Sequence, residues 1–190
     1  LADFLADLAA RSVSAAQRQL VGQRIRDVLR RADCRFFRDL SAARVQAAIA
    51  AIGEPTKDRP DGLSKQSLQH YARACKQFSR WLQRERHTAE DMLLGVKGYN
   101  ADTDKRHERR GFTAAEMDVL LDYTANKAAA RWKMTPQARA VAYRLAFSSG
   151  LRRNEIRTLT ARSFNLDADP PTVTVQAGYS KRKRQDVQPL

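Results

Sequence analysis

One segment of the chain, from Ser64 to about Glu85, limits the fold more than any other, because its apolar residues follow a strict helical period. They recur at alternating steps of three and four: Leu68, Tyr71, Cys75, Phe78 and Leu82. This spacing puts all of them on one face of an α-helix. An apolar stripe of this kind is buried against neighbouring elements, so the segment predicts a long amphipathic helix inside a helical domain.

The segments before it also carry helix signals. The sequence SAAQ at Ser14 has the form of a capping box, and apolar residues follow it at helical spacing. Ser41 offers an N-cap for an alanine-rich helix that Gly53 ends. Residues 54–62 hold two prolines and charges of both signs, which predicts an exposed loop. The first hundred residues therefore predict helices and little else.

A change of composition then divides the chain. Between residues 99 and 111 apolar side chains nearly vanish and charged ones dominate, which is typical of a linker. We therefore predict a helical domain over residues 1–98, a basic linker over 99–111 and the start of a mixed α/β domain over 112–190. The predicted fold class is mainly α, with a small antiparallel sheet in the second domain.

The second domain begins with helix signals and ends with a hairpin signal. Thr113 opens another capping box, TAAE, and Thr135 with Pro136 forms an N-cap and N1 pair for the next helix. A short helix is predicted over residues 152–159. The segment TVTVQA, followed by a turn at 178–184 and a returning strand at 185–190, predicts a half-buried β-hairpin.

The charge balance points to a polyanionic partner. The 190 residues include 35 Lys and Arg against 21 Asp and Glu, for a formal net charge of +14 at pH 7. Such an excess favours nucleic acid, since each neutralised phosphate releases condensed counterions. A membrane surface is the rival partner. However, no apolar run approaches the roughly 20 residues needed to span a bilayer, and no signal peptide opens the chain.

No motif for metal or nucleotide chemistry is present in the sequence. It lacks a Walker A loop, an H-E-x-x-H, a G-x-S-x-G and a C-x-x-C. Cys34 and Cys75 have no metal-ligand spacing, and we interpret both as small buried apolar residues in a reducing cytosol.

The predicted linker contains an H-x-x-R pair, His107 and Arg110, but no packed frame there holds an imidazole at a reacting atom. We interpret the linker as solvated and facing DNA. We expect its arginines to contribute positive charge rather than catalysis. They are Arg106, Arg109 and Arg110.

The side of residues 64–85 opposite the apolar stripe is basic, and we call it the basic stripe. Its members also recur at helical spacing: Lys65, Gln69, Arg73, Lys76, Arg80 and Arg84. A charge run on a helix is usually its solvated face, but such a face mixes both signs, and this one has no acid before Glu85. Two interpretations stay open, a solvated face and a face that contacts phosphates.

Arg152 stands out by its setting. A Ser-Ser-Gly break precedes it and a helix begins at once. A guanidinium in the first turn of a helix combines bidentate geometry with the positive end of the helix dipole, which suits a phosphate. Glu155, three residues on, shares its face and is placed to orient it. The alternative is a surface arginine beside an ordinary first-turn glutamate.

A second basic group, SKRKR at residues 180–184, falls at the predicted hairpin tip. One interpretation is a cluster of nucleic-acid backbone contacts. The other gives Lys181 a role of its own, because a lysine at a hairpin tip can enter a groove and donate a proton to a leaving oxygen. The remaining backbone contacts are then Arg182, Lys183 and Arg184.

Four stretches together resemble one family. SSGLRRNEIRTLTARSFNLD resembles the Thr-Gly-Leu-Arg-x-x-Glu-Leu box of the tyrosine recombinases, the phage-integrase type of site-specific DNA recombinase. TVTVQAGYSKRKRQDVQPL is similar to the hairpin that bears their catalytic lysine. LSKQSLQHYARACKQFSRWL resembles the last long helix of their core-binding domain, and RRGFTAAEMDVLL the start of their catalytic domain. The likeness is nearest to integrases of bacterial mobile elements.

The resemblance implies a four-helix, SAM-like core-binding domain followed by the N-terminal part of the catalytic domain. It implies that Arg152 is the first active-site arginine, which grips the scissile phosphate, and that Glu155 supports it. Lys181 is the implied general acid for the 5′-hydroxyl leaving group, with Lys183 as the alternative. In this family a tyrosine attacks a DNA phosphate, forms a 3′-phosphotyrosine and needs no metal, ATP or other cofactor; strands exchange through a four-way Holliday junction.

The sequence departs from the family pattern in two places. Ser163 and Asn165 stand where the family often has aspartates, which we expect to affect only a local turn. The family's second catalytic block, His-x-x-Arg followed by a His or Trp and the nucleophilic tyrosine, has no counterpart between Arg152 and Leu190. We therefore expect this chain to bind DNA without cleaving it.

The implied partner is double-stranded DNA at an attachment or recombination site. The family also implies a homo-tetramer on DNA for the complete recombinase, a place in the bacterial cytoplasm at the nucleoid, no membrane and no small-molecule cofactor. The alternative function is a non-catalytic DNA-binding regulator or decoy derived from an integrase. RNA binding is a weaker alternative, because the sequence offers no aromatic stacking platforms.

Overall fold

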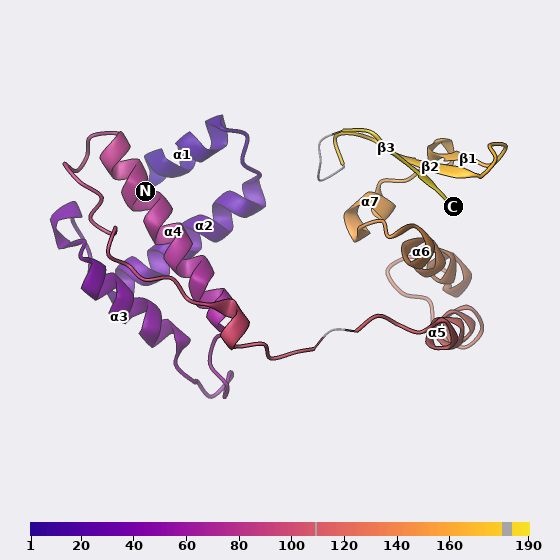
Figure 1. Cartoon of the computed structure of the whole chain (residues 1–190), viewed down its shortest axis with the longest axis horizontal. Helices are drawn as coiled ribbons and strands as arrows, with labels where there is room; N and C mark the ends of the chain where they lie inside the picture. Colours follow the sequence, from indigo (N-terminus) through magenta and orange to yellow (C-terminus); the bar gives the residue numbers. More distant parts are fainter. Residues whose placement is uncertain (109, 180–183) are drawn as a thin grey trace. The chain divides into compact units, whose positions relative to one another are not determined.

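A computed structural model describes residues 1–108, 110–179 and 184–190 of the chain (Figure 1). It is mainly helical with a small three-stranded antiparallel sheet, so the predicted fold class is confirmed. The chain forms two compact units, Leu1–Arg109 and Arg110–Leu190, which we describe one at a time. Within the described ranges, no helix is long and apolar enough to cross a membrane.

The first unit is a bundle of helices. α4 crosses α2 and packs against α3, while α1 packs on α2 (Figure 1). One short 3-10 turn follows α2, at Phe37–Asp39, and another follows α4, at Ala101–Thr103. The four helices are α1 (Ala2–Ala10), α2 (Ala15–Arg31), α3 (Ala42–Gly53) and α4 (Lys65–Arg84).

The starts of these helices follow from local side-chain caps. Ser14 Oγ accepts the Gln17 backbone N–H at 3.3 Å, as the sequence predicts, and Ser64 Oγ accepts the Ser67 backbone N–H at the same distance. Ser41 occupies the N-cap of α3 without a side-chain hydrogen bond. The loop after α3 closes at Gly62, where φ is +63° and a Cβ would lie 2.2 Å from the Gly53 carbonyl oxygen.

α4 supplies both hydrophobic clusters of this unit. Leu68, Cys75, Phe78 and Leu82 are buried and Tyr71 is half-buried, so the predicted apolar stripe is confirmed. The stripe is wider than predicted, since four further α4 residues are buried beside it. These are Ala72, Ala74, Ser79 and Trp81. The wider face lets one helix touch α2 and α3 at the same time.

The first half of the predicted linker is held against the first unit. Gln69 Oε1 accepts the Tyr99 backbone N–H at 2.6 Å, and Gln46 Nε2 donates to the Tyr99 hydroxyl at 2.9 Å. Five residues on, Asp104 accepts the Lys65 backbone N–H at 2.8 Å. Residues of α3 and α4 therefore form hydrogen bonds with a segment whose composition alone indicates that it is exposed.

The second unit begins with two packed helices, α5 (Ala114–Asn126) and α6 (Pro136–Ser149). The predicted capping box of α5 is present: Thr113 Oγ1 accepts the Glu116 N–H, and Glu116 accepts the Thr113 N–H. Thr135 Oγ1 accepts the Ala138 N–H and so caps α6, which ends at Gly150 in the left-handed conformation, with φ +65°.

The sheet follows the short helix α7 (Arg153–Arg157). β2 (Thr172–Val175) pairs antiparallel with β1 (Phe164–Asn165) on one edge and β3 (Asp186–Pro189) on the other. The β2–β3 hairpin was predicted, whereas β1 was not. Val173 and Val175 are buried against Leu151, so the residue just before Arg152 belongs to the small core of the sheet.

Candidate nucleic-acid interface

The middle of the basic stripe is open to solvent. Arg73 and Arg80 are exposed and Lys76 is half-buried. Within the described parts of the chain, none of the three forms an ion pair with a carboxylate. Three uncompensated cations at successive turns of one helix suit the phosphates of a nucleic-acid backbone.

Positive charge also reaches the stripe from α2. The pKa of His70, on α4, is lowered first by burial and then by the nearby guanidinium groups of Arg24 and Arg73. Sequence analysis did not select Arg24, because it lies on another helix and belongs to no periodic run of cations. The structure brings it to the stripe through the packing of α2 on α4.

The two ends of the stripe are bound to other parts of the first unit. Lys65 Nζ donates to Thr103 Oγ1 at 2.8 Å, and Gln69 holds Tyr99 as described above. Arg84 is paired with Asp7 at 3.3 Å and with Glu85 at 2.9 Å. The cations best placed for an outside partner are thus Arg73, Lys76 and Arg80.

A small hollow lies between α1 and the C-terminal half of α4. It has a volume of about 320 Å³ and is lined by Phe4, Arg11, Gln77, Arg80, Trp81 and Arg84. Arg11 was not predicted as a binding residue. It is the C-cap residue that follows α1, and it pairs with Asp7 at 3.5 Å. The hollow extends the basic surface of Arg80 toward the first helix.

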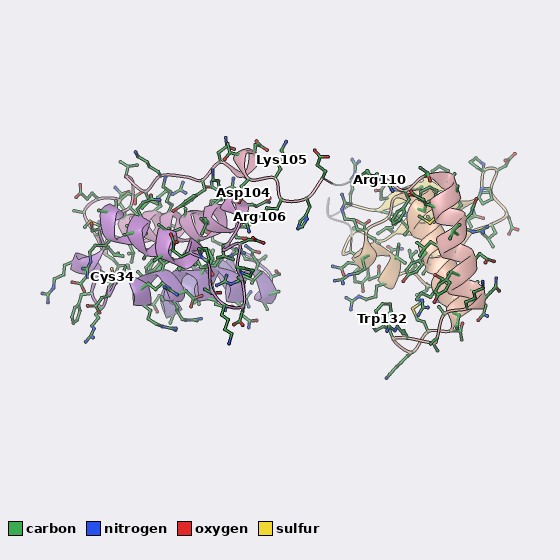
Figure 2. The ribbon with its side chains drawn as sticks, turned by 90° about the horizontal axis from the view of Figure 1, so that it is seen from below. Cys34, Asp104, Lys105, Arg106, Arg110 and Trp132 are labelled. Carbon is green, nitrogen blue, oxygen red and sulfur yellow. The ribbon has the colours of Figure 1, made fainter. Side chains whose placement is uncertain are left out.

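Arg106 has an internal role in the first unit. Its Nη1 and Nη2 donate to the carbonyl oxygens of Gly62 and Leu63, each at 3.1 Å, and its Nε donates to Asp104 at 3.0 Å. The hydrogen bond from Arg106 lowers the pKa of Asp104, and the Lys65 backbone N–H lowers it further. Asp104, Lys105 and Arg106 lie together on this segment (Figure 2).

Arg110 likewise forms hydrogen bonds within its own unit, the second. Its Nη1 and Nη2 donate to the two carboxylate oxygens of Glu116 at 2.7 and 2.5 Å. This fork, with the Thr113 backbone N–H, lowers the pKa of Glu116 to about 2. Arg109 lies outside the described residues, so its predicted DNA contact remains a prediction.

Arg152 is the N-cap of α7, one residue earlier than the helical position predicted for it. Glu155 accepts its backbone N–H at 2.8 Å and its Nη1 at 3.0 Å. The Glu155 side chain is 7% exposed, whereas that of Arg152 is 61% exposed. The carboxylate therefore lies inside and aims an arginine that faces outward. Because α7 has five residues, the guanidinium rather than a helix dipole is the anion-directed group.

A second hollow adjoins this arginine. Its volume is about 350 Å³, and it is lined by Arg152, Arg153, Asn154, Glu155 and Tyr179. Tyr179 follows β2, so the hairpin contributes one described residue to the hollow beside Arg152. Lys181, Arg182 and Lys183 themselves fall outside the described residues, and Arg184 is exposed.

Metal ligands do not gather in the part of the chain that the structure describes. It contains no group of three or more His, Cys, Asp or Glu side chains placed to share an ion. Cys75 is buried, Cys34 is half-buried, and both are free thiols. Their burial agrees with the structural role predicted for them.

Comparison with known proteins gives one similar solved structure to report, the integrase from mycobacterium phage Brujita. It is 17% identical to this chain, with a TM-score of 0.45. The alignment covers 99% of this chain and 56% of that integrase, so the chain spans little more than half the length of its neighbour. No family model and no curated protein matches the sequence.

Proposed function

We propose that this chain is the DNA-binding part of a site-specific recombinase of the tyrosine type, active on double-stranded DNA. The observation that carries the proposal is the Arg152–Glu155 pair, in which a buried carboxylate aims an exposed guanidinium beside the hairpin. The pair stands in the sequence context GLRRNE, which resembles the first arginine box of that family. A preset cation of this kind suits a phosphate on which charge develops.

The proposed reaction assigns one task to each group. A tyrosine oxygen attacks the scissile phosphorus, the P–O5′ bond breaks, and a 3′-phosphotyrosine forms. Arg152 donates hydrogen bonds to the non-bridging oxygens, and Lys181 donates a proton to the departing 5′ oxygen. The five tyrosines of this sequence all precede Lys181, and we assign none of them as the nucleophile.

DNA binding by the first unit is the second half of the proposal. Arg73, Lys76 and Arg80 contact the phosphate backbone, with Arg24 adding to the local potential. Residues 1–98 act as the core-binding domain and residues 112–190 as part of the catalytic domain. The complete recombinase assembles as a tetramer on its DNA site.

Binding of the chain to a duplex oligonucleotide tests this half directly. We expect the logarithm of the association constant to fall linearly with the logarithm of the salt concentration, with a slope set by the number of phosphate contacts. Fluorescence anisotropy at several salt concentrations measures it. A chain with no measurable affinity for duplex DNA at low salt contradicts the proposal.

A nicked suicide substrate tests the recombinase half on a protein that includes the nucleophile. A covalent protein–DNA adduct is expected, and Arg152→Ala is expected to abolish it while duplex binding persists. The second candidate is a non-catalytic DNA-binding regulator. Duplex binding without any adduct supports that candidate instead.

A further inference from the structure

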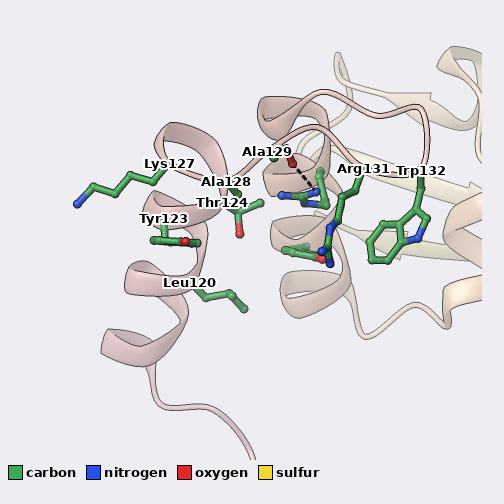
Figure 3. A pocket seen from close by; sticks show the side chains of 10 residues that line it. Leu120, Tyr123, Thr124, Lys127, Ala128, Ala129, Arg131 and Trp132 are labelled. Atoms are coloured by element: carbon green, nitrogen blue, oxygen red, sulfur yellow. Dashed lines mark hydrogen bonds between the residues drawn. The ribbon is translucent and has the colours of Figure 1, made fainter.

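One hollow of the second unit is distinct from the surfaces described above. It has a volume of about 590 Å³, within the range of small-ligand sites, and is formed by α5, α6 and the loop between them (Figure 3). The lining residues that matter here are Tyr123, Thr124, Arg131, Trp132, Arg139 and Tyr143. No acidic side chain lines it.

Arg139 is a buried cation at this site. The residue is 6% exposed, and its Nη1 donates to the Ala129 carbonyl oxygen at 3.1 Å, the dashed line in Figure 3. It has no carboxylate partner within the described ranges. A buried guanidinium without a counter-charge is costly, so the site favours an anion that enters from outside.

The other nitrogens of Arg139 are still reachable. Among the described residues, one side-chain nitrogen or oxygen is both fully buried and without a hydrogen-bond partner, Trp81 Nε1 in the first unit. No nitrogen of Arg139 is such an atom, so the guanidinium nitrogens of Arg139 that make no hydrogen bond are accessible from outside. The pocket that this residue lines gives them access to a ligand.

The loop holds Arg131 and Trp132 at the pocket in a strained turn. Arg131 and Met134 exchange backbone hydrogen bonds at 2.9 and 3.3 Å. Between them, Trp132 has φ +52° and Lys133 has φ +61°, a conformation that favours glycine or asparagine. Strained backbone conformations of this kind cluster at active sites and ligand-binding sites.

Trp132 also corrects an expectation from the sequence. The chain was expected to offer no aromatic stacking platform, yet Trp132 is 74% exposed and Tyr123 is 56% exposed, and both line the pocket. Periodicity does not reveal an exposed aromatic residue on a loop, such as Trp132. Lys127 extends away from Arg131 in Figure 3, so we assign it no part in the site.

We propose that this pocket binds a nucleotide, with the phosphate on Arg139 and Arg131 and the base stacked on Trp132. Cations beside an exposed indole match a phosphate joined to an aromatic base, as in sites for unpaired nucleotides. A carboxylate of an acidic peptide uses the cations and leaves the aromatic surface unused. The nucleotide is either free in solution or an unpaired residue of a DNA strand.

The test follows the indole signals in a proton–nitrogen NMR spectrum of the whole chain. The two tryptophans give two signals, which Trp132→Phe assigns. The probes are AMP, adenosine, inorganic phosphate, a duplex with a short single-stranded gap and the intact duplex. We expect AMP or the gapped duplex to shift the Trp132 signal, and adenosine and phosphate to bind about tenfold or more weakly than AMP, because each supplies one half of the contacts.

Variants separate the site from general electrostatics. Arg131→Gln is expected to weaken AMP or gapped-duplex binding about tenfold, and Arg139→Gln at least as much if it folds. Arg144→Gln is the matched control, because it removes an exposed arginine of α6 that does not line the pocket. Equal losses from Arg131→Gln and Arg144→Gln overturn the proposal.

The probes also identify the source of the nucleotide. A response to both AMP and the gapped duplex indicates a site for any nucleotide, and a response to the gapped duplex alone indicates an unpaired nucleotide of DNA. No Trp132 shift with either probe at millimolar concentration overturns the proposal, as does saturation by an acidic peptide that nucleotides do not displace. Binding of the intact duplex and its loss in Lys76→Ala report separately on the function proposed above.

Discussion

A single carboxylate holds Arg152 at both ends: Glu155 accepts its backbone N–H through Oε2 at 2.8 Å and its guanidinium through Oε1 at 3.0 Å. The same contacts serve the fold and the site. The first caps α7, and the second fixes one edge of the guanidinium. The neighbouring Leu151 is buried with Val173 and Val175, so the position of Arg152 is tied to the sheet as well.

This relationship predicts that substitution of Arg152 affects DNA binding, whereas substitution of Glu155 affects stability. Arg152→Ala removes a mostly exposed side chain, so we expect the free energy of unfolding to change by less than about 1 kcal/mol while affinity for duplex DNA falls. Glu155→Ala removes a buried cap and is expected to cost about 1–3 kcal/mol. Denaturant unfolding and anisotropy measure the two effects.

Arg157→Ala is the control for Arg152, since it removes an exposed arginine at the other end of α7. We expect it to change neither stability nor affinity beyond the loss of one distant charge. A loss of DNA affinity equal to that of Arg152→Ala indicates a diffuse electrostatic effect in place of an aimed guanidinium.

The basic stripe predicts a change in salt dependence. Lys76→Ala and Arg80→Ala are each expected to weaken duplex binding and to reduce the slope of the salt plot by about 0.9, the value for one phosphate contact. Arg30→Ala, an exposed residue six positions from Arg24 and on another face of α2, is the control. Unchanged slopes in both stripe variants place the stripe in solvent.

The hydrogen bonds of Arg106 lead to a prediction about the stability of the segment that follows the helical bundle. Because its guanidinium bonds two loop carbonyls and Asp104, Arg106→Ala is expected to lower the free energy of unfolding of the first unit by about 1–2 kcal/mol. Hydrogen exchange is expected to rise over residues 99–106. Lys105→Ala, an exposed neighbour, is the control, and equal exchange in the two variants contradicts the assigned role.

These results show which features local sequence determines. α4 with its start at Ser64, the caps at Ser14, Thr113 and Thr135, and the β2–β3 hairpin were predicted, because each depends on residues close together in the chain. β1 has two residues, too few for a periodic pattern to appear. Its pairing is fixed by β2, which lies across a turn.

The parts that were not predicted depend on contacts between distant residues. Nothing in the composition of 99–106 indicates that Gln69 and Lys65 bind it. Arg139 lies in a helix where an arginine is expected to be exposed, and its burial depends on the loop that supplies Ala129. Arg152 and Glu155 were predicted together because they lie three positions apart in the chain.

Glu116 predicts a local pH dependence in α5. Its pKa is lowered from 4.5 to about 2, first by Arg110 and then by the Thr113 backbone N–H. A depressed folded-state pKa stabilises the protein above the unfolded value, so this contribution is lost as pH falls from about 4.5 toward about 2. We expect the first turn of α5 to fray in that window, seen as faster exchange of the Glu116 amide. Arg110→Ala is expected to raise the Glu116 pKa, and a carboxyl titration by NMR that is unmoved in this variant contradicts the pairing.

The burial of the two cysteines predicts that Cys34 reacts with thiol reagents before Cys75. Burial raises the pKa of Cys75 to about 12, so almost no reactive thiolate is present at pH 8. Burial also raises the pKa of Cys34, against the nearby Arg44, but this thiol is half-buried and hydrogen-bonded to the Asp39 carbonyl oxygen at 3.3 Å. We expect native protein to label slowly at Cys34, and at Cys75 only when the bundle unfolds. Cys34→Ser should therefore abolish native labelling and Cys75→Ser should preserve it; rapid labelling of native Cys34→Ser contradicts the burial of Cys75.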